Sequence, residues 1–412
     1  MFVAIDNAPR DYAWGSRDAI AAYRGVQPSG DPEAELWLGA HAGSPAKIVD
    51  ATSVGHPDLA QWIAADPGTA LGARLAERAR LPFLLKVLAA AEPLSLQAHP
   101  TPQQARAGFE REESEGVPIG AYDRNYKDPF HKPELIVAVS ETFDALSGFR
   151  PLDQVRGMMA VLRAADAASA APEPGALDLL DSHLAGDDPL RTTVDWLLRD
   201  GRGEDTGESA WVIERVVALA STETARDSEF ALSFETVGLL SEFYPGDAGI
   251  VISLLLNRVR LKRGEALYLA AGNIHAYLEG LGIELMAASD NVLRGGLTPK
   301  HVDVGELLEV LDFTPIEPPY LTASSVAPGV VGYRPEVPDF ALYRVDAGSA
   351  AAVVPVRGPS ILLAEGDVEV AGAHGSITLA RGGAAFVTPD EGALTVHGSG
   401  GLWIATTAPT GA

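Results

Sequence analysis

The spacing of apolar residues changes twice along the chain, and this change restricts the possible architectures more than any other feature. From Pro151 to about Glu235, apolar residues recur every three or four positions, as in LRTTVDWLL and SAWVIERVVALA. This is the pattern of helices with one buried face. On both sides, short apolar segments alternate with Gly and Pro, which is typical of strands and turns. At Asp247 the β-like pattern returns, and the run from Ile250 to Leu261 predicts a strand. We therefore predict a β protein with an inserted helical domain at residues 151–235.

The region before the helical segment mixes the two patterns. Residues 58–80 have helical spacing that is interrupted at Pro67-Gly68, and the compact apolar run from Leu81 to Ala90 predicts a buried strand. The remainder of residues 92–150 is predicted as strand and loop. It contains a polar stretch, Glu110 to Asp128, that is rich in charge, Gly and Tyr and resembles an insertion.

The sequence pattern of the second half of the chain is typical of an all-β protein. The stretch KRGEALYLAAGNIHAYLEG is typical of a cupin or jelly-roll edge, and a short amphipathic helix is predicted from Val302 to Asp312. A Pro-rich link at residues 314–319 marks a boundary. A faint repeat relates Arg263 to Arg381; twelve residues further on lie His275 in the first copy and Ala393 in the second.

The predicted fold class is therefore mainly β with α: cupin-like jelly rolls plus an inserted helical domain. Residues 1–150 and 236–318 would form one discontinuous catalytic jelly roll, with the helical domain at 151–235. Residues 319–412 would form a C-terminal jelly roll without a metal site, because the second copy of the repeat lacks the histidine.

The charge of the chain excludes several kinds of partner. Lys plus Arg is 31 and Asp plus Glu is 56, which gives 31 − 56 = −25. Such a protein is poorly suited to bind nucleic acid or an anionic membrane. There is no Cys, no apolar run long enough to span a bilayer and no secretory signal, so we expect a cytoplasmic protein. An anionic substrate would need a local cluster of basic groups.

Two short blocks in the first half offer metal ligands. In LSLQAHP (94–100), Gln97 and His99 are two residues apart, so on a strand they share one face. In HKPE (131–134), Glu134 offers a carboxylate, and Lys132 would share its face. Each block also has a plainer interpretation, as the polar rim of a strand or as a solvated salt pair, and His131 is expected to be structural or exposed.

Two further blocks lie in the second half. His275 follows a small-residue turn, where it is well placed for the mouth of a barrel, although a single turn histidine is more often structural. The block from Glu284 to Lys300 combines Arg294 and Lys300 with the flexible pair Gly295-Gly296. Together the four blocks supply two His, one Glu and one Gln, a set that suits Zn²⁺. The neighbouring cations indicate a small anionic substrate, most simply a phosphate ester.

These blocks resemble the type I phosphomannose isomerase family. The matching stretches span residues 12–303, and the longest is ungapped: YAWGS (12–16), ELWLGAH (35–41), LPFLLKVL (81–88), LSLQAHP (94–100), HKPELIVA (131–138), GNIHAYLEG (272–280) and ELMAASDNVLRGGLTPKHVD (284–303). Only the segment Glu110 to Asp128 and the C-terminal domain depart from the family pattern, because both vary among its members.

The resemblance implies a role for each matched residue. One zinc ion per chain would be held by Gln97, His99, Glu134 and His275, and Arg294 would be essential for activity. The positions that would line the pocket are Glu284, Lys132, Ser95 and Lys300. It also implies an enzyme that acts on a small sugar phosphate, interconverting mannose 6-phosphate and fructose 6-phosphate. Separately from the resemblance, we expect a monomer.

The implied reaction moves a proton between C2 and C1 through an enediol. Glu284 is one candidate base, and a water activated by the metal is the other. Lys132 would stabilise negative charge on oxygen, while Arg294, Lys300 and Ser95 would hold the phosphate. Two alternatives stay open at this point: another metal-dependent cupin enzyme, such as an oxygenase, and a non-catalytic sugar-phosphate-binding regulator.

Overall fold

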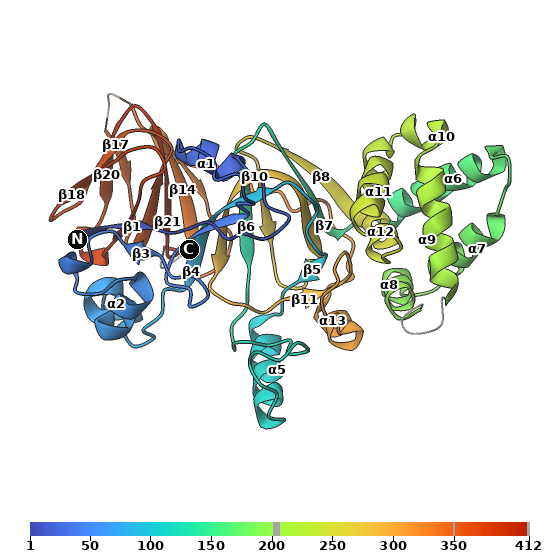
Figure 1. Cartoon of the computed structure of the whole chain (residues 1–412), viewed down its shortest axis with the longest axis horizontal. Helices are drawn as coiled ribbons and strands as arrows, with labels where there is room; N and C mark the ends of the chain where they lie inside the picture. Colours follow the sequence, from blue (N-terminus) through green and yellow to red (C-terminus); the bar gives the residue numbers. More distant parts are fainter. Residues whose placement is uncertain (201–206, 349–350, 410–412) are drawn as a thin grey trace.

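The computed structural model describes residues 1–200, 207–348 and 351–409. Three parts lie in a row along the longest axis: a C-terminal β sandwich, a central β region and a group of helices (Figure 1). The predicted fold class, mainly β with an inserted helical segment, is confirmed. Within the described residues, no helix is both long and apolar enough to cross a membrane.

The central β region is organised around β10 (His275–Ala287), which is shared by two groups of antiparallel strands. The second half of β10 pairs with β4 on one side and with β6 on the other, whereas its first residues pair with β5 and β7. The remaining strands extend these two groups, and the full set is β2 (Glu35–Leu38), β4 (Phe83–Ala90), β5 (Gln97–Ala98), β6 (Glu134–Ala138), β7 (Thr142–Phe149), β8 (Leu256–Lys262), β9 (Ala266–Leu269), β10 and β11 (Leu293–Arg294).

Side chains alternate between the two faces of these strands, as the pleat requires. In β4, Val87 and Ala89 pack toward the sandwich, while Leu88 and Ala90 pack into a separate core inside the central region. We call this second face the inner face. Lys86 has the same parity as Leu88 and therefore lies on the inner face, as does Glu134 relative to Ile136 of β6. The polar groups described below thus replace core residues.

The helices leave the central region after β7 and return before β8 (Figure 1). They are α6 (Leu152–Ala168), α7 (Pro174–His183), α8 (Pro189–Arg199), α9 (Gly207–Ala220), α10 (Glu223–Arg226), α11 (Ala231–Phe243) and α12 (Gly249–Ile252). The helical periodicity seen in the sequence is confirmed, although α11 crosses the predicted boundary at residue 235. The strand predicted from Ile250 is wrong in its first half. Residues up to Leu255 form α12 and the 3₁₀ helix η2 (Ser253–Leu255), because this uniformly apolar run packs into the helical core.

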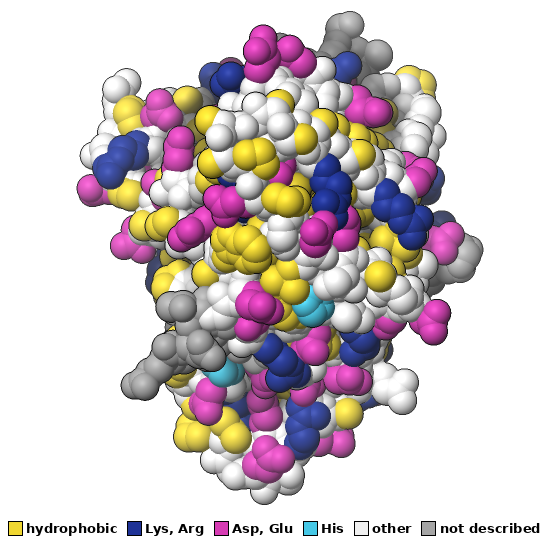
Figure 2. Space-filling model, turned by 90° about the vertical axis from the view of Figure 1, so that its right-hand side faces the viewer, with side chains coloured by type: hydrophobic (Ala, Val, Ile, Leu, Met, Phe, Trp, Pro, Cys, Tyr) yellow, Lys and Arg dark blue, Asp and Glu magenta, His cyan; other side chains and the backbone are white. Residues whose placement is uncertain are grey.

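One continuous apolar core joins the helices to the outer face of the central strands. It includes Leu146 and Phe149 of β7, Ala276 and Leu278 of β10, and Leu293 of β11. The helices therefore cover the back of the strands whose other face carries His275. Figure 2 views the molecule from its helical end, where acidic and basic side chains are interspersed with apolar ones.

The C-terminal sandwich consists of two antiparallel sheets. One has the order β12 (Ser324–Ala327), β13 (Val330–Tyr333), β14 (Ala341–Asp346), β21 (Gly401–Thr406), β16 (Ser360–Ala364), β19 (Ala384–Val387), β1 (Phe2–Asp6) and β3 (Lys47–Ile48). The other has the order β15 (Ala352–Val354), β20 (Leu394–Gly398), β17 (Val368–Ala371) and β18 (Ser376–Leu379).

The first strands of the chain belong to this C-terminal sheet. β1 pairs with β19 and β3 pairs with β1, which differs from the predicted division that placed all of residues 1–150 in the catalytic part. The physical reason is that strand pairing joins segments regardless of their separation in sequence. Short helices accompany these N-terminal strands: α1 (Ala19–Arg24), η1 (Ala51–Ser53), α2 (Leu59–Ala65), α3 (Pro67–Leu71) and α4 (Ala73–Ala76), with η3 (Pro389–Glu391) near the C-terminus.

Two helices lie near the open end of the central region. The predicted short helix after Val302 is confirmed as α13 (Val304–Val310). The structure also contains α5 (Pro102–Ser114), where strand and loop were predicted. Thr101 and Gln104 form a reciprocal cap at its first turn, and Pro102 suits the first helical position. These helix-start signals explain why the segment is helical although its polar composition was interpreted as loop.

Candidate active site

Three buried side chains meet on the inner face of the central region. His99 follows β5, Glu134 begins β6 and His275 begins β10, and each has a ligand atom within 4.8 Å of the other two. The Nε2 atoms of His99 and His275 lie 3.3 Å from opposite oxygens of the Glu134 carboxylate. All three residues are at most 1% exposed. Their sequence separation means that only the fold brings them together.

The other nitrogen of each histidine fixes how the ring presents itself to the cluster. The Nδ1 of His99 lies 2.8 Å from the backbone carbonyl of Asn291, and the Nδ1 of His275 lies 3.0 Å from that of Asn273. Carbonyls only accept hydrogen bonds, so both Nδ1 atoms carry the proton and both Nε2 atoms present lone pairs to Glu134. Both Nε2 atoms and one carboxylate oxygen have no hydrogen-bond partner although they are buried.

Lone pairs that face a carboxylate without a donor between them repel each other, and unpaired buried polar atoms are costly. A cation between them removes both penalties. The arrangement therefore fits a metal ion held through His Nε2 and carboxylate oxygen, with each histidine oriented by a backbone carbonyl, as in known metal sites.

Burial and charge also favour the ligand forms of these groups. Burial lowers the pKa of His99 to about 4, so its imidazole is neutral near pH 7. Burial would raise the pKa of Glu134, but the Lys132 ammonium, 3.1 Å from Oε1, outweighs it and holds the pKa of that carboxyl well below its usual range. The cluster thus consists of neutral imidazole and ionised carboxylate, as a divalent cation requires.

Gln97 and Arg294 are placed beside the cluster by strand pairing. Gln97 of β5 lies directly opposite His275 of β10 on one side and directly opposite Arg294 of β11 on the other. Residues directly opposite each other share a face of the sheet, with Cβ atoms about 5 Å apart. Gln97 is therefore a direct neighbour of His275 across the sheet, and Arg294 is the next residue beyond Gln97.

A cleft of about 390 Å³ opens above this cluster. All the predicted site residues except the two histidines line it: Ser95, Gln97, Lys132, Glu134, Glu284, Arg294 and Lys300. His131 does not line it and pairs instead with Asp339, 2.9 Å away, in accordance with the structural role expected for it. Burial lowers the pKa of Arg294, and burial together with the charge of Arg294 lowers the pKa of Lys300. The positive charge predicted from the sequence is present in this cleft.

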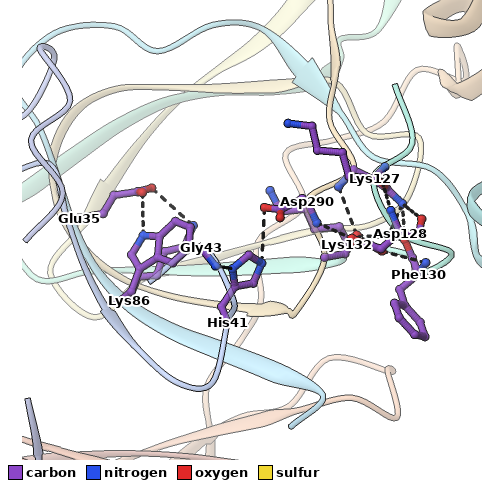
Figure 3. Close-up of polar contacts among 12 residues, drawn as sticks. Glu35, His41, Gly43, Lys86, Lys127, Asp128, Phe130, Lys132 and Asp290 are labelled. Carbon is purple, nitrogen blue, oxygen red and sulfur yellow. Dashed lines mark hydrogen bonds and ion pairs between the residues drawn. The ribbon is translucent and has the colours of Figure 1, made fainter. Parts of the chain in front are cut away.

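The cleft also contains a buried ion pair that the sequence analysis did not identify. The ammonium of Lys86 lies 2.7 Å from Oε2 of Glu284 and 3.4 Å from Glu35, and the Tyr277 hydroxyl donates to Oε1 of Glu284 at 3.0 Å. Figure 3 shows Glu35 and Lys86 in contact at one end of the group of polar residues. The available signal was a single charged residue in the apolar run LPFLLKVLAA, because a buried charge needs a partner.

The surroundings of this ion pair raise the pKa values of both Lys86 and Glu284. Burial lowers the pKa of Lys86, but Glu284 and Glu35 outweigh it and raise the pKa overall. Burial raises the pKa of Glu284, and the charges of Glu134 and Glu35 add to this effect while Lys86 opposes it. A carboxyl with a raised pKa beside an ammonium is well suited to exchange a proton with a bound molecule.

The fold and this cluster define a cupin-like metalloprotein whose candidate metal centre lies beside a cleft that contains basic side chains. The sequence pattern of "Phosphomannose isomerase type I, catalytic domain" matches residues 2–152. The mannose-6-phosphate isomerase of Escherichia coli is 37% identical over 96% of this chain and 97% of its own length. That of Rattus norvegicus is 33% identical over 93% of both chains. The chain belongs to the type I phosphomannose isomerase family.

A solved structure extends the comparison to three dimensions. The crystal structure of a mannose 6-phosphate isomerase bound with zinc and yttrium superimposes with a TM-score of 0.84 at 32% identity, covering 99% of this chain and 100% of that one. That protein binds zinc, which agrees with the chemistry of the donor set described above. The comparison does not favour the alternatives of an oxygenase or a regulator.

Proposed function

We propose that this protein is a zinc-dependent aldose–ketose isomerase that interconverts mannose 6-phosphate and fructose 6-phosphate. One observation carries the proposal. Buried ligand atoms of His99, Glu134 and His275 face one another without hydrogen-bond partners. Arg294 lies on the other side of Gln97 from His275, so only one strand residue separates it from this cluster. A metal centre and an anion-binding group at this spacing suit a small phosphorylated sugar. The near-full-length similarity to mannose-6-phosphate isomerases supports the same substrate.

In this proposal, one zinc ion per chain is held by Gln97, His99, Glu134 and His275. When bound, zinc acts as a Lewis acid toward the carbonyl and hydroxyl oxygens at C1 and C2. The ammonium of Lys132, beside Glu134, stabilises the negative charge that develops on the substrate oxygen during enolisation.

Arg294, Lys300 and Ser95 bind the phosphate. Arg294 can hold two phosphate oxygens at once, whereas Lys300 acts as a point charge and Ser95 donates a single hydrogen bond. Holding the remote phosphate fixes the position of C1 and C2, which converts binding energy into orientation at the reacting carbons.

Glu284 carries the proton between C2 and C1. Its hydrogen bonds with Lys86 and Tyr277 fix the carboxylate on the wall of the cleft. Burial and the neighbouring carboxylates raise the pKa of Glu284, which makes its carboxylate a better proton acceptor. Lys86 opposes this effect by stabilising the ionised form, which favours return of the proton to the other carbon of the enediol.

The finer assignments are also proposals. We propose a catalytic jelly roll from residues 1–150 and 236–318, a helical domain at 151–235 and a C-terminal jelly roll at 319–412, with β1 and β3 contributed to the last. We propose further that the enzyme is a cytoplasmic monomer that serves carbohydrate metabolism, including GDP-mannose biosynthesis. Light scattering behind size-exclusion chromatography tests the oligomeric state.

The test is a coupled assay for fructose 6-phosphate formed from mannose 6-phosphate. Activity should disappear when the metal is removed by a chelator and return on addition of one equivalent of zinc, with zinc content measured by elemental analysis. A protein that binds zinc stoichiometrically yet forms no ketose phosphate would exclude the isomerase. Activity that depends on oxygen and a reductant would instead identify another metal-dependent cupin enzyme.

A further inference from the structure

The loop between α5 and β6 reaches the basic end of the cleft. Lys127, in this loop, lines the same cleft as Arg294 and Lys300. Figure 3 shows its side chain extending away from the polar contacts that Asp128 and Phe130 make around it. The segment Glu110 to Asp128 contains none of the site residues that the sequence analysis singled out, so the position of Lys127 in the cleft comes from the structure.

The loop is fastened to the segment that carries Lys300. The Tyr122 hydroxyl donates to the carbonyl of Pro299 at 3.3 Å, and its ring contacts that of His301 edge-on, with centroids 5.8 Å apart. Further along, the amide of Asn125 donates to Asp303 at 2.9 Å and the Tyr126 hydroxyl donates to Glu306 at 2.6 Å. These contacts fix the loop beside residues 299–306.

A buried asparagine fixes the backbone of Lys127 itself. Asn291 is fully buried, and its Oδ1 accepts hydrogen bonds from the backbone N–H groups of Lys127 (2.8 Å) and Asp128 (3.3 Å). Its Nδ2 donates to the carbonyls of Asp128 and Phe130 at 2.7 and 2.8 Å. The carbonyl of the same residue orients His99. One residue thus positions both a metal ligand and the lysine loop.

Lys127 is an exposed residue at the basic end of the cleft, whose lining also includes the acidic Asp290. In the part of the chain that the structure describes, its ammonium forms no ion pair. Its charge adds to burial and to the charge of Arg294 in lowering the pKa of Lys300. Three cations that repel each other across a cleft are stabilised by a ligand with more than one negative charge, and a phosphate monoester near pH 7 is such a ligand.

We propose that Lys127 is a third cationic ligand of the substrate phosphate, placed in the cleft by the α5–β6 loop. This inference rests on the proposed function for the identity of the phosphorylated substrate. The observation that supports phosphate binding at this position, however, is the grouping of three cations at one end of the cleft. Lys127 contributes affinity for the phosphate, whereas the chemistry at C1 and C2 belongs to the metal centre and Glu284.

The test compares Lys127→Met with Lys127→Arg and with Lys47→Met as a matched control. Lys47 is an exposed lysine on β3 of the C-terminal sandwich and does not line the cleft. Asn291 holds Lys127 through the backbone N–H group, so removal of the side-chain charge leaves this anchoring of the loop intact. Binding of inorganic phosphate to the zinc-loaded protein is measured by calorimetry, and KM and kcat are measured with mannose 6-phosphate.

Lys127→Met should weaken phosphate binding and raise KM by about tenfold or more, the range expected for loss of a charged hydrogen bond, with kcat changed much less. Lys127→Arg should restore both values to within about threefold, and Lys47→Met should match the unchanged protein. Equal phosphate affinity in the Lys127→Met and unchanged proteins overturns the proposal, whatever the turnover. If the unchanged protein forms no ketose phosphate, the proposed function fails, but weaker phosphate binding by Lys127→Met still supports the role of Lys127.

Discussion

Replacement of Lys86 by Met tests how the charges in the cleft are balanced. The side chain of Lys86 is 7% exposed and that of Glu284 is 3% exposed, and their charged atoms are 2.7 Å apart. Met has a similar length but no charge, so the variant retains most of the packing and leaves Glu284 buried without a counter-ion. Glu35 loses its contact with the same ammonium.

The size of the effect follows from the proton that Glu284 then binds. A buried, unpaired carboxyl takes up a proton, and its pKa in the folded variant rises above pH 7. Its pKa in the unfolded chain is about 4.3, so keeping it protonated at pH 7 costs about 1.36 × 2.7, or about 3.7 kcal/mol. Because the folded pKa lies above the unfolded one, the penalty is absent below about pH 4 and grows as the pH rises; at pH 5 it is about 1 kcal/mol. The value at pH 7 agrees with the range of about 3–5 kcal/mol for broken buried pairs.

Urea denaturation of metal-free protein at pH 5 and pH 7, followed by tryptophan fluorescence, measures both free energies of unfolding. The double variant Lys86→Met/Glu284→Gln should recover most of the loss at pH 7, because the amide cannot ionise. Lys262→Met, which removes an exposed lysine, serves as the control. A loss below about 1 kcal/mol at pH 7, or equal losses at the two pH values, would refute the reasoning.

Four further outcomes are expected. His99→Ala should lose zinc and more than about 100-fold of its turnover together, and full zinc content by elemental analysis would contradict the ligand assignment. Arg294→Lys retains the charge but cannot form the bidentate contact with the phosphate, so kcat/KM should fall about 100-fold. Near-normal kinetics would exclude a role for Arg294 in positioning the substrate. His374→Ala and His397→Ala, at exposed positions of the C-terminal sandwich, should keep turnover within about twofold in the coupled assay. In metal-free protein, His99 protonates below about pH 6.5 when unfolded but only near pH 4 when folded. Stability should therefore fall by about 3 kcal/mol as the pH drops from 6.5 to 4, and His99→Gln should flatten that part of the urea-denaturation profile.

Periodicity and residue chemistry were sufficient to predict a large part of the architecture. The helical spacing after Pro151 predicted helices that the structure contains, because an amphipathic pattern is a local property of the sequence. Residue chemistry offered Gln97, His99 and Glu134 as metal ligands, although each had a plainer interpretation alone, and the family resemblance implied that they act together. The structure brings them to one face, and their roles stay predictions until the variants are measured.

Other features depend on contacts that local patterns do not encode. The run after Ile250 is uniformly apolar, and such a run suits a buried strand or a buried helix equally well. Lys86 lies within a correctly placed strand, but its partner Glu284 is 198 residues away in sequence, so the pair could not be derived from spacing. The pairing of β1 with β19 likewise joins strands at opposite ends of the chain, which local patterns do not encode.

The shared apolar core between the helices and the outer face of β7, β10 and β11 has a consequence for attempts to shorten this enzyme. Deleting the helical segment would expose to solvent the apolar outer face of the strands that carry His275 and Arg294. The truncated barrel would then rearrange or aggregate, and its catalytic groups would lose their alignment without any of them having been touched. The inserted helices are thus required to hold in place the strands that carry the site residues on their other face.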